Sequence, residues 1–436
     1  MDNIIIIGAG VSGLSVSYHL RKQHTVFETE KHPGGLCKSV RIGGCTFDYS
    51  GHFIHFHHPE TTKLINGKLL RGNISTINRK AWAHTHGAYI PYPFQANLYA
   101  LPADIRKECV DGVLKRPRKK LSGKKNFYEW SVETFGAGIT KYFMKPYNEK
   151  LWTVPARTLT TEWSLPFVPR PSRKEILMSA AGPAEASRNL GYNASFSYPE
   201  SGGIQALIDS LSEKTADLRT GTKITKVNLK NKYVEDSEGE IHYYDTLVSS
   251  APLDELIKMA SGVPPEISAA AKKLRCNSVY CLNIAFSEKY AGPGLAGKHW
   301  VYFPEKRFNF YRAGVYSNIS QGMAPQGMSS MYIEISAPGG RRLGKNSAFE
   351  DVKQGLVAAG ILAPGPKIEI VEWLDMPHAY VIYDRNRADA VKTIQEFLIK
   401  NNVRSIGRYG AWKYSFMEES IWEGMQLARE LNDKAD

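Results

Sequence analysis

Residues 4–13 of the chain read IIIIGAGVSG, and residues 25–28 read TVFE. Four consecutive β-branched residues predict a buried strand, and the glycines that follow predict a tight turn into a helix. Gly8 permits the turn, Gly10 lets a pyrophosphate approach the backbone at the helix N-terminus, and Gly13 lets helix and strand pack closely. Together they predict the strand–helix–strand unit of a dinucleotide-binding domain.

The identity of the dinucleotide is indicated by the residues that follow this unit. Glu28 comes twenty residues after Gly8, where a carboxylate binds the ribose hydroxyls of a dinucleotide. A second glycine pair, Gly34 and Gly35, is followed by Leu36 and brings another backbone segment to the same ligand. This arrangement resembles the FAD-binding N-terminus of the amine oxidase and sugar mutase flavoproteins, so we expect FAD rather than an exchangeable NAD.

Later segments are expected to support the same cofactor. Residues 221–227 predict a strand that carries Ile224 to the adenine end, and residues 247–252 predict the strand and turn that return to the nucleotide domain. The C-terminal helix from Glu419 and Ser420 would direct the positive end of its dipole toward the flavin.

The order of predicted elements indicates an α/β protein in three parts. These parts are a discontinuous Rossmann-type FAD-binding domain (1–78, 196–262 and 395–436), an inserted helical domain (97–190) and an antiparallel β-sheet substrate domain (79–96 and 263–394). Within the helical part, Phe127–Met144 predicts a single helix. Residues 180–193, rich in Ala, Gly, Ser and Asn, are a candidate mobile lid.

The composition is that of a globular enzyme with surplus positive charge. The 436 residues include 56 Lys and Arg against 43 Asp and Glu, a net charge of +13 that attracts anions such as nucleotide sugars. No basic stripe with interleaved aromatic residues is present, so we expect no nucleic acid partner. The basic residues at 115–125 predict a solvated loop, with membrane-surface attachment or a targeting signal as alternatives.

Cysteine count and hydropathy bear on location. Five scattered cysteines predict neither a disulfide framework nor a zinc site. No signal peptide and no apolar run of about eighteen residues is recognisable, so we expect no membrane span and a cytoplasmic location. His52, His55, His57 and His58 lack the carboxylate spacing of a metal site, so no metal is expected.

Six short segments bring tyrosine, tryptophan, asparagine and arginine together. Aromatic rings stack on sugars and bases, while arginine and asparagine bind phosphates and hydroxyls. The segments are DYSGHFI (48–54), IPYPFQ (90–95), FMKPYNEKLW (143–152), WVYFPE (300–305), FYRA (310–313) and GRYGAWKY (407–414). In this order they closely resemble the UDP-galactopyranose mutases, the eukaryotic-type enzymes more than the bacterial ones.

The resemblance implies a role for each matching residue. Gly51 and His52 would form the loop at the flavin face, with Gly407 and Arg408 close to flavin and sugar. The uridine pocket would be lined by Tyr92, Phe94, Gln95, Asn148 and Trp152. The sugar and the diphosphate would be contacted by Asn193, Trp300, Tyr302, Arg312, Tyr380 and Tyr414. The residues expected nearest the reacting atoms are His52, Arg312 and Arg408, with Arg312 as the diphosphate clamp.

The resemblance also implies the reaction. The pyranose and furanose forms of a nucleoside-diphosphate sugar would interconvert by attack of N5 of reduced FAD on the anomeric carbon, without net electron transfer. The protein would hold the diphosphate leaving group and exclude water. NAD(P)H is one candidate reductant, and a homo-oligomer is one candidate assembly.

Three departures from the family leave the substrate open. Phe167 stands where the family has a second diphosphate arginine, and Arg170 is the nearest replacement in the sequence. Ile319 replaces a family tyrosine, and the segment after Tyr414 has the bacterial spacing. UDP-galactose is the first expectation, and another nucleoside-diphosphate hexose, N-acetylated or deoxygenated, is the alternative.

Two other classes of function share the N-terminal motifs. One is a true FAD-dependent oxidase or desaturase of the amine oxidase group. The other is a non-catalytic binding protein on the same scaffold, like the Rab GDP-dissociation inhibitors. A protein without flavin would not need the complete glycine set and Glu28, which disfavours the second class.

Overall fold

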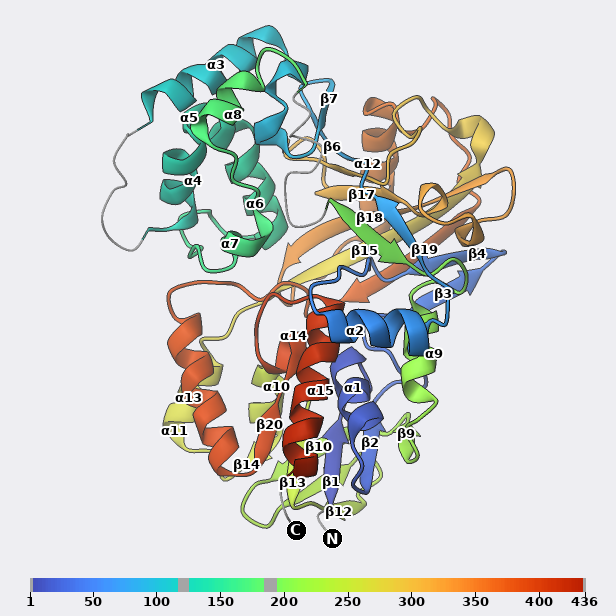
Figure 1. Cartoon of the computed structure of the whole chain (residues 1–436), viewed down its shortest axis with the longest axis vertical. Coiled ribbons are helices and arrows are strands. Elements are labelled where there is room, and N and C mark those ends of the chain that lie inside the picture. Colours follow the sequence, from blue (N-terminus) through green and yellow to red (C-terminus); the bar gives the residue numbers. More distant parts are fainter. Residues whose placement is uncertain (1–2, 117–124, 184–193, 434–436) are drawn as a thin grey trace.

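The computed structural model describes residues 3–116, 125–183 and 194–433. The lower half of Figure 1 contains a parallel sheet of five strands. In spatial order its strands are β20 (Val403–Ser405), β13 (Thr246–Ser249), β1 (Ile4–Ile7), β2 (His24–Glu28) and β9 (Leu218–Thr220). All four isoleucines of β1 are buried, as expected for the central strand of a sheet that is covered on both faces.

The first and the last helix of the nucleotide-binding half lie side by side. α1 (Val11–His19) follows β1, and α15 (Met417–Asp433) packs along it (Figure 1). Gly424 lets the two backbones approach at Ser15, whose hydroxyl donates to the carbonyl of Ile421 at 2.7 Å. The nucleotide-binding half is therefore completed by two helices that lie far apart in the sequence, α1 and α15.

The other elements of the lower half surround this sheet. Its remaining helices are α2 (Pro59–Leu64), α9 (Gln205–Ser212), α10 (Leu253–Met259), α11 (Pro265–Ala271), α13 (Arg387–Lys400) and α14 (Gly407–Gly410). A small second sheet has the order β12 (Ile241–Tyr243), β11 (Tyr233–Asp236), β10 (Ile224–Asn228) and β14 (Ala260–Ser261). Two further antiparallel pairs are present: β3 (Ser39–Ile42) and β4 (Cys45–Asp48) form a hairpin, and β5 (Ser75–Asn78) pairs with β8 (Ser195–Tyr198), far away in the sequence.

The upper half contains a mostly antiparallel sheet of seven strands. In spatial order they are β19 (Ile370–Met376), β15 (Asn277–Ser287), β18 (Met328–Pro338), β17 (Arg312–Val315), β16 (Trp300–Tyr302), β6 (Ala81–Thr85) and β7 (Ala88–Pro91). α12 (Lys345–Ala358) packs on it through an apolar cluster that includes Leu356, Phe308 and Phe310. The long strands β15 and β18 run from this cluster toward the nucleotide-binding half (Figure 1).

The helical part differs from the sequence-based prediction at one point. Its helices are α3 (Ala103–Lys115), α4 (Phe127–Phe135), α5 (Ala137–Ile139), α6 (Lys145–Trp152), α7 (Ser164–Phe167) and α8 (Arg173–Met178). The single helix predicted over Phe127–Met144 is wrong, because the chain breaks at Gly136, which has φ 86°. The backbone of Gly136 passes directly against Gly112 of α3, where no side chain would fit. Long-range packing therefore ends a helix that local propensity would continue.

The predicted α/β fold class is confirmed. A Rossmann-like parallel sheet, an inserted set of helices and a mostly antiparallel sheet are all present. Within the described ranges, none of the helices combines the length and the apolar character that a bilayer crossing requires.

Candidate functional site

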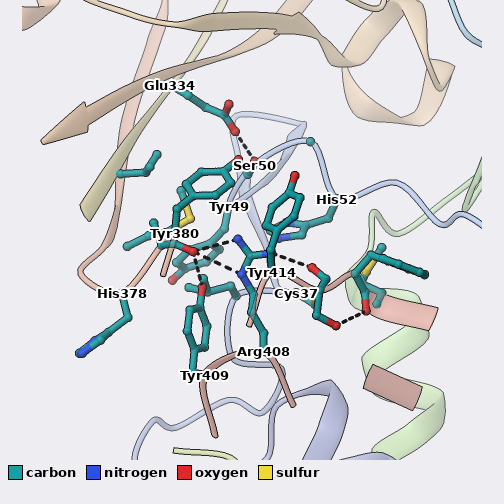
Figure 2. A pocket seen from close by; sticks show the side chains of 18 of the residues that line it. Cys37, Tyr49, Ser50, His52, Glu334, His378, Tyr380, Arg408, Tyr409 and Tyr414 are labelled. Atoms are coloured by element: carbon teal, nitrogen blue, oxygen red, sulfur yellow. Dashed lines mark hydrogen bonds between the residues drawn. The ribbon is translucent and has the colours of Figure 1, made fainter. Parts of the chain in front are cut away.

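One large cavity lies where the parallel sheet, the helices and the antiparallel sheet meet. Its volume is about 850 Å³. It begins at the carboxyl ends of β1 and β2, the edge at which open parallel sheets bind their ligands. From there it continues along β16, β17 and β18, and Figure 2 shows part of its wall.

The dinucleotide end of the cavity is a cradle of glycine backbone. The N–H of Gly34 donates to the carbonyl of Ala9 at 2.8 Å, and a Cβ on Gly35 would lie 3.4 Å from the Cα of Gly10. Glu28 Oε2 accepts from the N–H of Ala9 at 2.8 Å, which holds the carboxylate at the cavity wall. The cradle therefore offers backbone to a pyrophosphate and a fixed carboxylate to a ribose.

Two further glycines shape the cradle without lining the cavity. A side chain on Gly13 would overlap the carbonyl oxygen of Gly8, so Gly13 is needed for the contact between helix and turn. Gly407 has φ 77°, and a side chain there would collide with Ser12. Gly8, with φ 95°, makes the turn itself and lines the cavity.

The loop that follows β4 is held firmly in the cavity wall. The carbonyl of Ser50 accepts from the N–H of His52 at 2.8 Å and from the hydroxyl of Tyr316 at 3.3 Å. A side chain on Gly51 would overlap the hydroxyl of Tyr332. Burial, together with nearby arginine charges, lowers the pKa of His52 to about 4, so the ring is neutral at physiological pH. Among the described residues, the buried His52 Nδ1 has no hydrogen-bond partner.

A buried ion pair stands beside this loop. Arg312 lies opposite Glu334 in the β17–β18 register, and its Nε and Nη2 donate to the two carboxylate oxygens at 2.5 and 2.7 Å. The hydroxyl of Ser50 donates to the same carboxylate, as Figure 2 shows. Burial raises the pKa of Glu334, but the Arg312 charge and these hydrogen bonds outweigh it and lower the pKa below the usual value. Glu334 is therefore ionised.

Arg408 lies between tyrosine rings close to the loop. Its Nη2 donates to the carbonyl of Ala379 at 2.9 Å, and its Nη1 donates to the carbonyl of Ser415 at 2.7 Å. The guanidinium lies 5.1 Å from the ring centre of Tyr380 and 5.0 Å from that of Tyr414 (Figure 2). Arg408 thus fixes two phenols in the cavity wall.

The far end of the cavity is aromatic and carries amides. The rings of Tyr92 and Tyr302 lie 5.1 Å apart, and the fully buried indole of Trp152 packs edge-to-face on Tyr414 with centroids 6.0 Å apart. Asn148 and Gln95 each donate to a backbone carbonyl, at 2.7 and 2.5 Å. In the described part of the chain, Gln95 Oε1 has no partner, which fits a ligand N–H. A planar base with hydrogen-bonding edges suits this end of the cavity.

Most of the residues predicted from the sequence line this one cavity. They are Gly8, Gly10, Glu28, Gly35, Leu36, Gly51, His52, Tyr92, Gln95, Asn148, Trp152, Trp300, Tyr302, Arg312, Tyr380, Arg408, Tyr414 and Ser420. They come from separate stretches of sequence between residues 8 and 420, yet they line one continuous cavity.

Besides Gly13 and Gly407, five predicted residues are not among those that line the cavity. Phe94 is fully buried in the core of the helical part, stacked on another phenylalanine. Ile224 is buried in β10, and Glu419 forms an ion pair with Lys413, which precedes α15. The side chain of Arg170 is exposed, although its neighbours Pro169 and Pro171 are buried. Asn193 lies outside the described residues.

Several wall residues escaped the sequence analysis. Glu334, Ser50, Tyr311 and Arg79 all line the cavity. The pairing of Glu334 with Arg312 depends on the register of two strands that are 22 positions apart at this point, which no local motif reveals. The one available signal was an acidic residue within the apolar run of residues 331–335.

The histidines near the loop have structural partners. The N–H groups of His57 and His58 donate to the buried carboxylate of Glu418 at 2.7 and 2.9 Å, and Thr61 also binds this carboxylate with 2.5 Å between oxygens. The ring of His58 stacks on Trp422 with centroids 4.4 Å apart. This segment therefore connects α2 to α15.

Comparison with known proteins gives three main matches. Residues 6–67 match the NAD(P)-binding Rossmann-like domain family. A crystal structure of reduced UDP-galactopyranose mutase superposes with a TM-score of 0.93 and 29% identity, covering 99% of this chain and 95% of that one. A putative protoporphyrinogen oxidase from Exiguobacterium sp. 255-15 superposes with a TM-score of 0.76 at 14% identity, covering 99% and 98% of the two chains.

Among curated sequences, protoporphyrinogen oxidase 2 from Arabidopsis thaliana is 21% identical over 315 residues. The alignment covers 61% of this chain, and the chain spans 61% of the length of that relative.

The fold and the cavity define a flavoprotein-type scaffold, in which a Rossmann-like nucleotide domain meets a substrate sheet across one site. Within that class, the resemblance to the UDP-galactopyranose mutase family is confirmed over nearly the whole chain. The oxidases share the fold at lower similarity.

Proposed function

We propose that the chain is a FAD-dependent mutase that interconverts the pyranose and furanose forms of a nucleoside-diphosphate sugar, with UDP-galactose as the first substrate to test. One observation carries the proposal: a single cavity joins the glycine cradle to a wall of cationic and phenolic side chains around Arg312. The similarity to reduced UDP-galactopyranose mutase supports it.

The residues present fit FAD. The glycine cradle offers backbone to the pyrophosphate, Glu28 offers a carboxylate to the ribose, and His52, whose Nδ1 has no partner among the described residues, lines the same cavity. When bound and reduced, FAD supplies the nucleophile for the anomeric carbon. The predicted mode is non-covalent, so acid precipitation should release all of the flavin.

The chain itself must stabilise the diphosphate as it leaves the sugar. Arg312 supplies the positive charge, and the phenols of Tyr302, Tyr380 and Tyr414 line the cavity around it. Burial raises the pKa of Tyr302 and of Tyr414, so both keep the hydroxyl proton that a phosphate oxygen accepts. Donors fixed before the reaction lower the cost of developing negative charge.

A direct test uses anaerobic enzyme reduced with dithionite. Incubation with UDP-galactofuranose and chromatography of the products should show UDP-galactopyranose, with no turnover by oxidised enzyme. Equal rates for the two redox states, or oxygen consumption in proportion to substrate, would show that the mechanism is a different one. NAD(P)H can replace dithionite in a parallel reaction to test the reductant.

A FAD-dependent oxidase is the second candidate, because sequence relatives include protoporphyrinogen oxidase 2. The oxygen measurement above separates it from the mutase. If the chain is a mutase, one observation gives a reason to test substrates other than UDP-galactose. Phe167 packs edge-to-face on Tyr414, with centroids 4.3 Å apart, at the position where the family has an arginine. A panel of nucleoside-diphosphate hexoses, including N-acetylated and deoxygenated ones, tests this alternative.

A further inference from the structure

Three residues from distant parts of the chain form a closed hydrogen-bonded cluster beside the cavity. Glu334 of β18 accepts from Arg312 through both carboxylate oxygens and from the hydroxyl of Ser50. Arg312 Nη2 also lies 3.3 Å from Ser50 Oγ. Only 1% of the Glu334 side chain is exposed, so water contributes little to this cluster.

The cluster leaves one side of the arginine for a ligand. Its Nε and Nη2 are bonded within the cluster, whereas Nη1 makes no hydrogen bond to any residue that the structure describes. Because Glu334 is ionised, the pair is neutral before a ligand arrives. A diphosphate that binds Arg312 must therefore share the guanidinium with a buried carboxylate, and each anion weakens the hold of the other.

Ser50 connects this competition to the loop at the expected flavin face. Its side chain binds Glu334, and its carbonyl accepts from the N–H of His52. Gly51, between them, lies against Tyr332, and a Cβ added there would come within 2.4 Å of the Tyr332 hydroxyl oxygen. A change in the Glu334–Ser50 bond is thus passed on to the backbone at His52.

We propose that Glu334 is a positioning residue that couples the diphosphate subsite to the flavin-face loop through Ser50. An anion on Arg312 weakens the bonds from Arg312 to Glu334, and the carboxylate then bonds more strongly to Ser50. The loop consequently presents a different environment to the cofactor when a nucleoside diphosphate is bound. This coupling deepens the proposed function, since it rests on Arg312 as the diphosphate site.

The test uses oxidised holoenzyme and UDP, so no turnover is involved. Calorimetry gives the UDP affinity, and the visible difference spectrum gives the response of the flavin to UDP. Ser50→Ala should keep the UDP affinity within about threefold of the original enzyme, because Ser50 is not a diphosphate ligand. The flavin response at saturating UDP should fall to roughly half or less, because its path through Ser50 is cut.

Ser39→Ala is the matched control. Ser39 belongs to the β3–β4 hairpin that precedes the loop of Ser50, and its hydroxyl donates to Asp48 at 2.6 Å rather than to Glu334. It should leave both the UDP affinity and the flavin response unchanged. A full response in Ser50→Ala, or an equal loss in Ser39→Ala, overturns the coupling.

Glu334→Gln provides a second measurement. The neutral amide leaves the buried positive charge of Arg312 without a compensating negative charge. A bound diphosphate supplies that negative charge. UDP should therefore raise the melting temperature of Glu334→Gln more than that of the original enzyme, and an equal or smaller rise overturns the proposal. If neither UDP nor inorganic pyrophosphate changes the flavin spectrum of the original enzyme, the coupling is also overturned.

These outcomes are separable from those of the mutase assay. An enzyme that does not isomerise sugar nucleotides but shows a Ser50-dependent flavin response to UDP retains the coupling and loses the proposed function. An enzyme that isomerises UDP-galactofuranose and keeps a full response in Ser50→Ala loses only the coupling.

Discussion

The two ends of the cavity are built in opposite ways. The cradle comes mainly from residues 8–35, and its backbone shape determines what it can bind. The other end, where we propose that the diphosphate binds, is called the diphosphate wall. It consists of side chains such as Arg312, Glu334 and Tyr414, which strand register and a distant loop bring together. A backbone site should therefore fail as a unit when one glycine is replaced, whereas a side-chain site should lose its function in steps.

The largest effect is expected in the cradle. A valine at position 13 would overlap the backbone carbonyl of Gly8, which no rotamer change can relieve. We expect Gly13→Val to be destabilised by roughly 3 kcal/mol or more and to be purified with little or no flavin. The flavin-to-protein absorbance ratio measures this. Gly67→Ala is the control, since nothing lies within 4 Å of the added methyl group, and equal flavin content in both variants would contradict the backbone account.

The next effect belongs to the diphosphate wall. Removal of the Arg312 charge should cost about 2 to 4 kcal/mol of transition-state stabilisation, or roughly thirty to a thousandfold in kcat/KM, while flavin content stays normal. Arg170→Ala should have a much smaller effect, because Arg170 is exposed and does not line the cavity. A mild Arg312→Ala phenotype beside a severe Arg170→Ala one would place the nucleotide in another pose.

A gain of charge tests the same wall from the other side. Phe167 lines the cavity and packs on Tyr414, so an arginine there would add a cation near the diphosphate subsite. We expect Phe167→Arg to tighten UDP binding by about three- to tenfold, measured by calorimetry. Phe167→Leu should show no such gain. Unchanged affinity in the arginine variant would mean that the phosphates lie elsewhere.

The smallest effect concerns acid stability of the substrate sheet. His84 of β6 is surrounded by the rings of Tyr89, Phe303 and Phe308, and burial lowers its pKa to about 4. As the pH falls from about 6.5, the unfolded chain takes up the proton first. Stability is therefore complete above about pH 6.5 and decreases toward pH 4, and the loss from this residue reaches on the order of 1 kcal/mol at pH 6.

Urea unfolding at pH 7.5 and pH 5 measures this loss. His84→Phe should lose less stability between the two pH values than the original chain does. The exposed His32→Phe should behave like the original chain. The same loss in all three proteins would assign the acid sensitivity to other groups.

The two ends also differ in how far the sequence could predict them. The glycines and Glu28 were predictable, because a tight turn and a close backbone approach demand these residue types at a fixed spacing. Arg312 was found through family resemblance, but its partner Glu334 was not, since their contact depends on strand register. Arg170 is the opposite case. It was chosen because it is close to Phe167 in the sequence, but it is not among the residues that line the cavity.

The helical part illustrates the same limit. Phe94 belongs to a predicted binding segment, yet its ring faces the core while its neighbour Gln95 reaches the cavity. The break at Gly136 arises from contact with Gly112, which sequence periodicity cannot reveal. Residues that act through backbone geometry are therefore predictable from local sequence, and residues that act through a distant partner require the fold.

The packing of α15 along α1 has a consequence for biosynthesis. The helix that follows the cradle turn and contains Gly13 finds its covering partner only after residues 417–433 have been made, because Ser15 packs against Gly424, far away in the sequence. Contacts of such high sequence separation form late, since the loop between them must close first. Nascent chains that lack residues 417–433 should consequently lack a stable cofactor cradle, so cofactor loading should require this segment.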